Sequence, residues 1–270
     1  MKQIIEVVPY NPEWPEMFES EAKLIKEALG TNCISIYHIG STSVPGLKAK
    51  PIIDILPVVK DIQQVDLTTE AMEFIGYEAK GEFGIAFRRY FQKGKSGRTH
   101  NIHVYEEGDP EIDRYLKFRN WMRSHKNDAK AYSKLKLALA EKFPNDILQY
   151  CFGKDAFVAS IDAKDGYSGY RMVQALTDIE WATVRALCPE HFLDRHKDHI
   201  HFVFYKNSEI IGYSHLQLCP KNRASLLMLA IDKRYRNLGW DSLFLKLLKR
   251  WLKHQSYEID SQGLEMTKNF

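Results

Sequence analysis

The chain has 270 residues, of which 44% are hydrophobic, 12% aromatic and 27% charged. This apolar content excludes a wholly disordered or collagen-like protein, and the length favours two domains over one. The formal net charge is only +3, which is too small for bulk binding to nucleic acid or to an anionic membrane. Any recognition of phosphate must therefore be local.

The N-terminal segment and the cysteines indicate a cellular compartment. Prolines and glutamates interrupt the first apolar residues, and no stretch approaches the roughly 20 apolar residues that a membrane span needs. The four cysteines are widely scattered, so we expect reduced thiols rather than a disulfide framework or a zinc knuckle: Cys33, Cys151, Cys188 and Cys219. We therefore expect a soluble cytoplasmic protein with no membrane or nucleic-acid partner, and no oligomeric state is implied.

Hydrophobic periodicity predicts alternating strands and helices in the first 161 residues. The pattern predicts strands over 4–8, 33–39, 51–59 and 101–105, and helices over 16–29, from 110 to about 124, and from about 128 to 143. Asp109 and Asp128 are expected to cap the last two helices, and Pro144 to end the second of them.

A polar, glycine-containing segment over 162–169 is predicted to be a linker between two domains, 1–161 and 170–270. The second domain is expected to contain strands over 170–174, 199–205, 209–218 and 225–231, with helices over 178–187 and from Trp240 onward. The fold class is therefore α/β (α+β), with a larger first domain and a smaller second one.

A first set of polar residues surrounds the turn after the strand 33–39. Gly40 and Ser41 are followed, after 12 intervening residues, by Asp54 within an apolar strand. Glycine lets backbone approach a phosphate, the serine hydroxyl can donate to its oxygens, and a strand carboxylate can hold Mg²⁺. This pattern is typical of phosphoryl transfer, although an ordinary Gly-Ser turn between strands is the alternative.

Two-metal nucleotidyl transfer would need a second carboxylate two residues after Asp54, but that position is Leu56. The strand 101–105 offers Asn101 and His103 where a third acidic ligand is expected. Asp54, His103 and His38 remain as candidate catalytic residues, with Asp54 and His103 also candidate ligands for Mg²⁺ or Mn²⁺ and, less favoured, Zn²⁺. Candidate substrate-binding residues complete the set: Gly40, Ser41, Lys50, Arg88, Arg89, His100, Lys136 and Lys154.

Seven separated blocks in residues 1–161 together resemble the GrpB family. They are YNPEWPEMFESE, HIGSTSVPGLKAKPIIDI, GIAFRRYF, RTHNIHV, FRNWMR, YSKLKLALAEKF and YCFGKDAF. The resemblance implies a domain with the mixed sheet of the DNA polymerase beta-like nucleotidyltransferases. It places the Gly-Ser of that superfamily on Gly40 and Ser41 and its first metal carboxylate on Asp54. Relatives usually have His-His-x-His where this chain has Asn101, which is a departure from the pattern.

A second set of residues follows the predicted strand 225–231. Arg234, Arg236 and Gly239 lie in a basic turn before a helix, an arrangement that directs free amides toward an anion. The Arg-x-x-Gly spacing and the order of elements resemble the GNAT acetyltransferases, which implies acetyl-CoA or CoA as the ligand. Asp241 departs from the small residue of that motif, and the 16 residues after His254 lead us to expect an incomplete GNAT-like domain.

Two functions fit these patterns. The first is a two-domain transferase, in which a nucleotidyltransferase-like domain acts on a nucleotide or CoA-related phosphate and an N-acetyltransferase domain transfers an acyl group. The second is a non-catalytic sensor or scaffold that binds a nucleotide or CoA-type small molecule in degenerate active sites. Leu56 and Asp241 favour the second function, whereas Asp54 and the histidines favour the first. Tyr213 and His215 are the weaker candidates for acid-base chemistry in the second domain.

Overall fold

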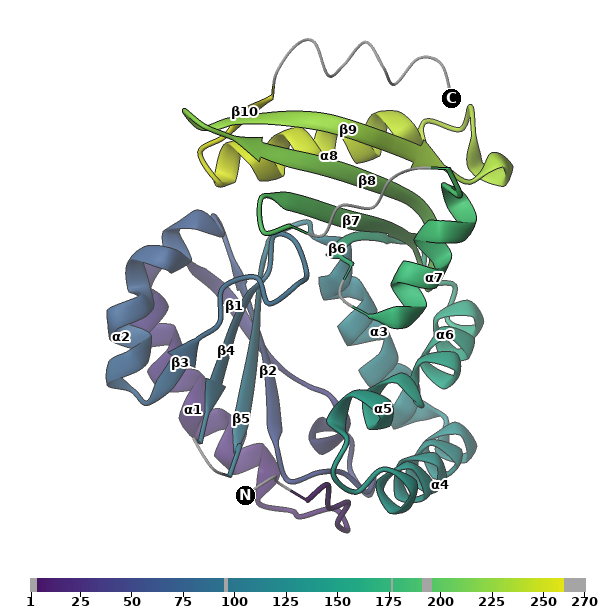
Figure 1. Cartoon of the computed structure of the whole chain (residues 1–270). Helices are drawn as coiled ribbons and strands as arrows, with labels where there is room; N and C mark the ends of the chain where they lie inside the picture. Colours follow the sequence, from purple (N-terminus) through teal and green to yellow (C-terminus); the bar gives the residue numbers. More distant parts are fainter. Residues whose placement is uncertain (1–3, 95–96, 176, 191–195, 260–270) are drawn as a thin grey trace. The chain divides into compact units, whose positions relative to one another are not determined.

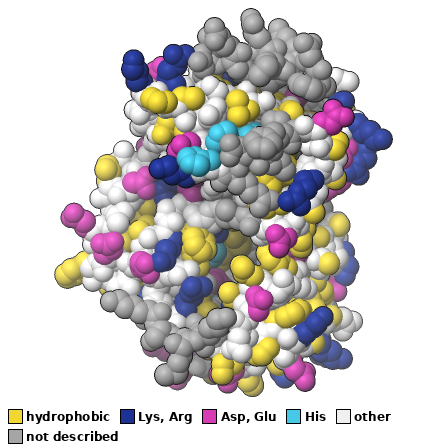
Figure 2. All heavy atoms as spheres, in the orientation of Figure 1, with side chains coloured by type: hydrophobic (Ala, Val, Ile, Leu, Met, Phe, Trp, Pro, Cys, Tyr) yellow, Lys and Arg dark blue, Asp and Glu magenta, His cyan; other side chains and the backbone are white. Residues whose placement is uncertain are grey.

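The computed structural model describes residues 4–94, 97–175, 177–190 and 196–259 (Figure 1). The chain forms two compact units, one of residues 1–83 and 87–169, the other of residues 84–86 and 170–270. Within the described ranges, no helix is both long and apolar enough to cross a membrane. On the face in Figure 2, Lys and Arg side chains are interspersed with Asp and Glu, as the small net charge predicts.

The first unit is built on a five-stranded mixed sheet in the order β1-β2-β5-β4-β3. Its central strands β2 and β5 are parallel, and the other neighbours are antiparallel. The strands are β1 (Cys33–Ile39), β2 (Ile53–Val59), β3 (Tyr77–Ala79), β4 (Arg89–Lys93) and β5 (His100–Glu106). Both faces of the central strands are apolar along much of their length, so both faces must be covered.

Helices α1 (Trp14–Leu29) and α2 (Thr69–Phe74) cover one face of this sheet, and α3 (Pro110–Ser124) begins a helical layer on the other (Figure 1). That layer continues with α4 (Lys126–Lys142), α5 (Ile147–Phe152) and α6 (Asp155–Lys164). Phe18 and Ile25 of α1 pack against the β2 and β5 side chains of the first face. Leu56 and Tyr105 pack against α3 on the second face. Both contacts bury apolar area, which stabilises the sheet.

The second unit also has a five-stranded sheet, in the order β10-β9-β8-β7-β6. Its strands are β6 (Tyr170–Gln174), β7 (His199–Lys206), β8 (Glu209–Cys219), β9 (Arg223–Ile231) and β10 (Glu258–Ile259). The helices are α7 (Asp178–Leu187) and α8 (Trp240–His254), and a capping box of Thr177 and Glu180 begins α7. Each unit is thus a mixed α/β domain, and the predicted fold class is confirmed.

Two local predictions were wrong. Residues 4–8 form no strand: Val8 makes a single bridge with Ala49, and Ile5 N donates to the carbonyl oxygen of Pro144 instead of to a neighbouring strand. Asp128 does not begin α4; its carboxylate instead accepts hydrogen bonds from Trp121 Nε1 and Lys164 Nζ. The segment predicted as a linker, 162–169, begins inside α6, where buried Asp162 pairs with Arg114 of α3, and the two units divide at its end, between Gly169 and Tyr170.

Candidate functional site

The strand register of the first unit brings Asp54, Asn101 and His103 to one face of the sheet. Asp54 lies opposite Asn101 in the parallel β2–β5 pair, and His103 follows Asn101 by two residues. Side chains two apart in a strand share a face, and in-register neighbours point the same way. The His103 Nε2 and Asp54 Oδ1 atoms are accordingly 4.0 Å apart.

Gly40 is the residue that lets the turn after β1 approach Asp54. Its φ is +69°, a left-handed conformation that favours glycine, and a Cβ at this position would lie 2.4 Å from Asp54 Oδ2. Any side chain at position 40 would therefore collide with the carboxylate. The turn leads directly to Ser41, whose side chain is partly exposed.

Asp54 is held by a chain of polar contacts along β5 and β4. Asn101 Nδ2 donates to Asp54 Oδ1 at 2.9 Å, and Tyr90 OH donates to Asn101 Oδ1 at 2.9 Å. Gln92 Nε2 in turn donates to the Tyr90 hydroxyl, and Arg98 Nη2 donates to Gln92 Oε1. Asn101 thus uses both ends of its amide to orient the carboxylate, a role that the sequence analysis missed.

His103 is a neutral imidazole in this arrangement. Burial and, to a smaller extent, the charge of Arg88 together lower the pKa of His103 to about 3. Arg88 Nη1 lies 3.4 Å from His103 Nδ1, and a guanidinium can only donate. The proton of the neutral ring is therefore assigned to Nε2, the nitrogen that faces Asp54.

Three lysines from different elements bring cationic charge to the same carboxylate. Lys50, Lys136 and Lys154 each act electrostatically on Asp54 or are acted on by it. Lys50 and Lys154 lie 5.2 and 4.8 Å from the centre of the Tyr150 ring, and Lys136 lies 4.6 Å from that of Tyr132. These two aromatic platforms were not anticipated from the sequence.

An aromatic ring attracts an ammonium group without neutralising it, so Lys50 and Lys154 keep their positive charge beside Tyr150. Within the described ranges, none of the three lysines has a carboxylate within ion-pair distance. Arg98 adds a further positive charge near Asp54, and Lys50 and Arg98 both line a cavity of about 430 Å³. One carboxylate therefore faces a surplus of positive charge, which favours an anionic ligand.

The pKa values of the site follow from burial. Burial raises the pKa of Asp54 above its usual value, although the Asn101 hydrogen bond and the cations oppose that shift. Burial also lowers the pKa of Lys50, and the nearby Lys154 charge lowers it further. The pKa of Lys136 falls to about 7, again chiefly through burial and then through Lys154.

The residues present do not fit a divalent metal. Among the described residues, no group of three or more His, Cys, Asp or Glu side chains gathers as a metal site would require. Asp54 Oδ1 already accepts from Asn101, and the surrounding cations would repel Mg²⁺ or Mn²⁺. The donor set around Asp54 and His103 therefore does not fit the metal-ligand roles expected for these two residues.

His38 does not share the site, contrary to the sequence prediction. It lies opposite Ile55 in the β1–β2 pair, and its ring stacks on Phe18 of α1 with centroids 4.8 Å apart. Its Nε2 is 3.0 Å from Thr42 Oγ1, and burial followed by the charges of nearby arginines lowers its pKa to about 4. His38 is thus a neutral core residue on the opposite face of the sheet from Asp54.

His100 is also placed on the opposite face. It lies opposite Ile53, whose side chain belongs to the core under α1. The His100 ring packs edge-on against Tyr77, and its Nδ1 is 3.0 Å from Thr99 Oγ1. The structure therefore does not bring His100, predicted to bind substrate, to the face of Asp54 and His103, because it lies three positions before His103 and an odd spacing reverses the face.

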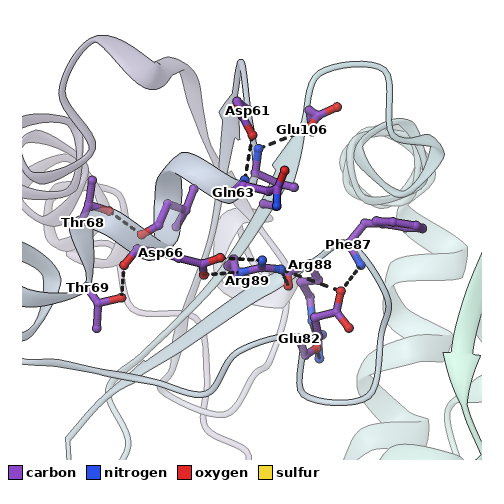
Figure 3. A network of polar contacts seen from close by, with 12 residues as sticks. Asp61, Gln63, Asp66, Thr68, Thr69, Glu82, Phe87, Arg88, Arg89 and Glu106 are labelled. Atoms are coloured by element: carbon purple, nitrogen blue, oxygen red, sulfur yellow. Dashed lines mark hydrogen bonds and ion pairs between the residues drawn. The ribbon is translucent and has the colours of Figure 1, made fainter. Parts of the chain in front are cut away.

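The side chains of Arg88 and Arg89 point in different directions, because the two residues are adjacent in the chain (Figure 3). Arg88 contacts His103 and donates to the carbonyl oxygens of Glu82 and Phe83. Arg89 makes a bidentate ion pair with Asp66, at 2.5 and 2.7 Å. Arg89 therefore stabilises the packing of the 63–68 segment on the sheet, and its predicted role in substrate binding is corrected.

We expect the Arg89→Met variant to lose stability but to keep its ligand affinity. The bidentate pair with Asp66 is charge-assisted, so its loss should lower the free energy of unfolding by about 1–3 kcal/mol. Urea unfolding and calorimetric titration of the variant measure the two quantities. A matched Asp66→Asn variant should lose a similar amount, with little further loss in the double variant. If the variant instead bound the ligand more weakly at an unchanged free energy of unfolding, Arg89 would be a ligand-binding residue.

The second unit contains the predicted basic turn before α8, but one of its two arginines is paired with carboxylates. Gly239 begins α8 with φ +82°, and no atom lies within 4 Å of a Cβ built there. Arg234 is exposed and already paired with Glu209 and Asp232, so its charge is largely neutralised. Arg236 Nε donates to the Ile231 carbonyl oxygen at 3.1 Å. Of the two predicted cationic residues, Arg236 is thus the one with no carboxylate within ion-pair distance in the described ranges.

The structure supplies one element that was not expected in the second unit. Strand β10 pairs in parallel with β9 through Glu258 and Ile259, after α8. The sequence had suggested little room for a strand there. His199 Nδ1 lies 2.7 Å from His215 Nε2, and His201 Nδ1 lies 2.8 Å from Tyr213 OH, so the two weaker candidates take part in a polar cluster on β7 and β8.

The protein is a two-domain α/β protein. Each unit is built on its own mixed sheet, and the first unit has a cationic site at a Gly-Ser turn. Residues 4–164 match the model of the family described as GrpB protein, which is more than half of the chain. The chain therefore belongs to the GrpB family. Residues 171–262 match the acetyltransferase (GNAT) family, so a GNAT domain follows the GrpB domain.

Relatives of known sequence and structure agree with this assignment. The UPF0157 protein YqkA of Bacillus subtilis is 47% identical over 161 residues, which are 60% of this chain and 47% of that protein. The crystal structure of the conserved protein GrpB from Enterococcus faecalis has 46% identity and a TM-score of 0.57, covering 59% of this chain and 96% of that one.

A more distant relative is the dephospho-CoA kinase of Mycolicibacterium paratuberculosis. It is 24% identical over 180 residues, covering 57% of this chain and 42% of that protein. The chain thus spans about half the length of the curated relatives YqkA and this kinase.

Proposed function

We propose that the GrpB domain is a transferase that binds the phosphates of a nucleotide or CoA-type small molecule beside Asp54. One observation carries the proposal: Lys50 and Lys154 act on the single carboxylate of Asp54 beside a Gly-Ser turn, and neither has a carboxylate within ion-pair distance in the described ranges. Ammonium groups bind phosphate oxygens through charge-assisted hydrogen bonds. The relation to a dephospho-CoA kinase supports a CoA-type ligand.

In this proposal Gly40 gives the phosphate access to the backbone, and the Ser41 hydroxyl donates to one of its oxygens. Lys50 and Lys154 neutralise the phosphate charge. Asn101 orients the Asp54 carboxylate, which accepts a hydrogen bond from a hydroxyl of the ligand. The neutral His103 ring lies beside Asp54 and adds no charge of its own to the site.

The second domain is proposed to bind acetyl-CoA or CoA and to transfer its acyl group. The match to the GNAT family supports this function, together with the open left-handed turn at Gly239 before α8. Free amides at the start of a 15-residue helix and the Arg236 guanidinium would meet the diphosphate there.

A non-catalytic sensor remains the second candidate function. It is favoured by Leu56, which leaves the first site with a single carboxylate on β2, and by the exposed Asp241 in the first turn of α8. Such a protein would bind the same ligands but return them unchanged. The two functions are separated by turnover in the presence of bound ligand.

Calorimetric titration with ATP, CTP, CoA and acetyl-CoA tests the first site. We expect micromolar binding of at least one ligand, retained in EDTA, and weakened at least about tenfold by Lys154→Met, which removes one phosphate contact. The matched control is Lys134→Met, because Lys134 is exposed on α4 and is not among the residues of the site. The CoA titrations are repeated in Gly239→Asp, which removes the site proposed for the second domain.

Absence of any binding at millimolar ligand would contradict the proposal for the GrpB domain. So would equal losses in Lys154→Met and Lys134→Met, because that result would show general attraction to a basic surface. Product formation under the binding conditions, followed by chromatography of the nucleotide or CoA species, then decides between a transferase and a sensor.

A further inference from the structure

Ser41 and Lys136 form a partly buried pair that phosphate binding alone does not require. Lys136 Nζ lies 2.8 Å from Ser41 Oγ, although the residues are 95 positions apart in the chain. Lys136 is only 2% exposed, whereas Ser41 is partly exposed and so can meet a ligand. The lysine also contacts the carbonyl oxygen of Lys48.

The surroundings of Lys136 favour a neutral amine. Its side chain lies under the Tyr132 ring on α4, with Lys154 of the 153–155 turn and Asp54 of β2 as the charged groups that act on it. In the part of the chain that the structure describes, no carboxylate is within ion-pair distance of it. Burial of an unpaired ammonium is costly, so the amine loses its proton readily, with a pKa of about 7.

Lys136 Nζ donates to the Ser41 hydroxyl oxygen and to the Lys48 carbonyl oxygen. Once the amine has lost its proton, its lone pair can instead accept the Ser41 O–H, while an N–H still donates to the Lys48 carbonyl oxygen. A serine hydroxyl that donates to a base of near-neutral pKa is an activated nucleophile.

Neighbouring hydroxyls have other partners. Ser43 Oγ donates to the Gly40 carbonyl oxygen at 2.6 Å, and Thr42 Oγ1 contacts the Ile52 carbonyl oxygen and His38. Both of these side chains are also buried. Of the three hydroxyls in this turn, Ser41 is the one that is both directed at an amine and open to a ligand.

We propose that Ser41 is a nucleophile, with Lys136 as its base, that attacks the phosphorus of a phosphoanhydride bound in the site. The Oγ–P bond forms, and the bond from phosphorus to the bridging oxygen breaks. The leaving phosphate takes the electron pair, and the Ser41 proton passes to Lys136 Nζ. The product is a phosphoester on Ser41, and Lys50 and Lys154 balance the charge of the leaving group. The identity of the phosphoanhydride rests on the proposed function of the GrpB domain.

A fluorophosphonate probe tests the nucleophile without the natural ligand. Ser41 Oγ displaces fluoride from its phosphorus, and the adduct is mapped by mass spectrometry of the intact protein and of its peptides. We expect labelling at Ser41 whose rate rises with pH to a plateau, with a midpoint near 7. Ser41→Ala should abolish the adduct, and Lys136→Arg should slow it at least about 100-fold, because arginine stays protonated.

Lys136→Arg separates a base from a cation that merely binds phosphate, because it keeps the positive charge. Lys134→Arg on the exposed side of α4 is the matched control and should label like the parent. The pH profile of the parent needs no variant, so the test holds even if Lys136→Arg folds poorly. Absence of labelling at Ser41, a flat pH profile, or full labelling in folded Lys136→Arg would overturn the inference.

Incubation with ATP and CTP extends the test to phosphoanhydrides. A phosphorus-containing adduct on Ser41 in the parent, absent in Ser41→Ala, is the expected result. If calorimetry shows binding but neither an adduct nor probe labelling is found, Ser41 is not a nucleophile, and the proposed function is unaffected. If the probe labels Ser41 but no nucleotide or CoA ligand binds, the proposed function is contradicted, and the assignment of Ser41 as a nucleophile is unaffected.

Discussion

The Leu56→Asp variant is expected to be severely destabilised rather than to gain a metal centre. Leu56 is fully buried, packed with Ile39 and Tyr105 against α3. Replacing it leaves a cavity, which costs about 2–5 kcal/mol, and buries a carboxyl group in addition. Because whole domains are stable by only about 5–15 kcal/mol, this loss should unfold much of the GrpB domain at neutral pH. Urea unfolding followed by tryptophan fluorescence measures it.

The pH dependence of this loss identifies its cause. Burial raises the pKa of a carboxyl group, so the introduced acid stays protonated in the folded domain at pH values where the unfolded chain has lost its proton. The destabilisation should therefore be smallest below about pH 4 and grow as the pH rises. Leu56→Asn, which is polar but does not titrate, should show a cost that does not follow this dependence. A stable Leu56→Asp variant with Mg²⁺-dependent nucleotide binding would contradict this account of Leu56.

The second large effect is expected for Gly239→Asp, which should abolish CoA binding by the GNAT domain. Gly239 has a left-handed φ of +82° at the start of α8, where backbone amides are free. An aspartate there adds a side chain and a negative charge at the point where the diphosphate would come closest. Calorimetry with CoA and acetyl-CoA compares this variant with the parent.

Gly239→Asn is the matched control, because asparagine has the size of aspartate and tolerates the left-handed conformation without a charge. We expect it to weaken CoA binding less than Gly239→Asp does. Unchanged CoA affinity in Gly239→Asp, or no affinity in the parent at millimolar ligand, would contradict the acyl-CoA function of this domain.

Much of the fold was predictable from local patterns. Strand β1 and helix α7 have the predicted limits, because an apolar β-branched run and a capping motif define them locally. Strands β3 and β4 and helices α5 and α6 were not assigned, because they are short and their apolar residues are set by packing. The error at Asp128 has the same origin, since one of its partners, Lys164, is 36 residues away and the other, Trp121, belongs to the preceding helix α3.

The candidate site, too, was predictable only where local patterns place its residues. The twofold period of a strand placed Asp54 and His103 on one face, and the same period could have excluded His100 and separated Arg88 from Arg89. The burial of Lys136 could not be read from the sequence, because it depends on how α4 packs against the 40–48 segment. A lysine in an amphipathic helix usually points to solvent.

The parallel pairing of β2 with β5 makes this site a late product of folding. Asp54 and Asn101 are 47 residues apart, and the lysines of the site come from residues 50, 136 and 154. A contact of that range requires closure of a long loop, which is an entropically slow step. A growing chain on the ribosome therefore cannot bring these residues together until nearly the whole GrpB domain has emerged. The ligand proposed for this site would accordingly prolong the lifetime of the folded state rather than guide its formation.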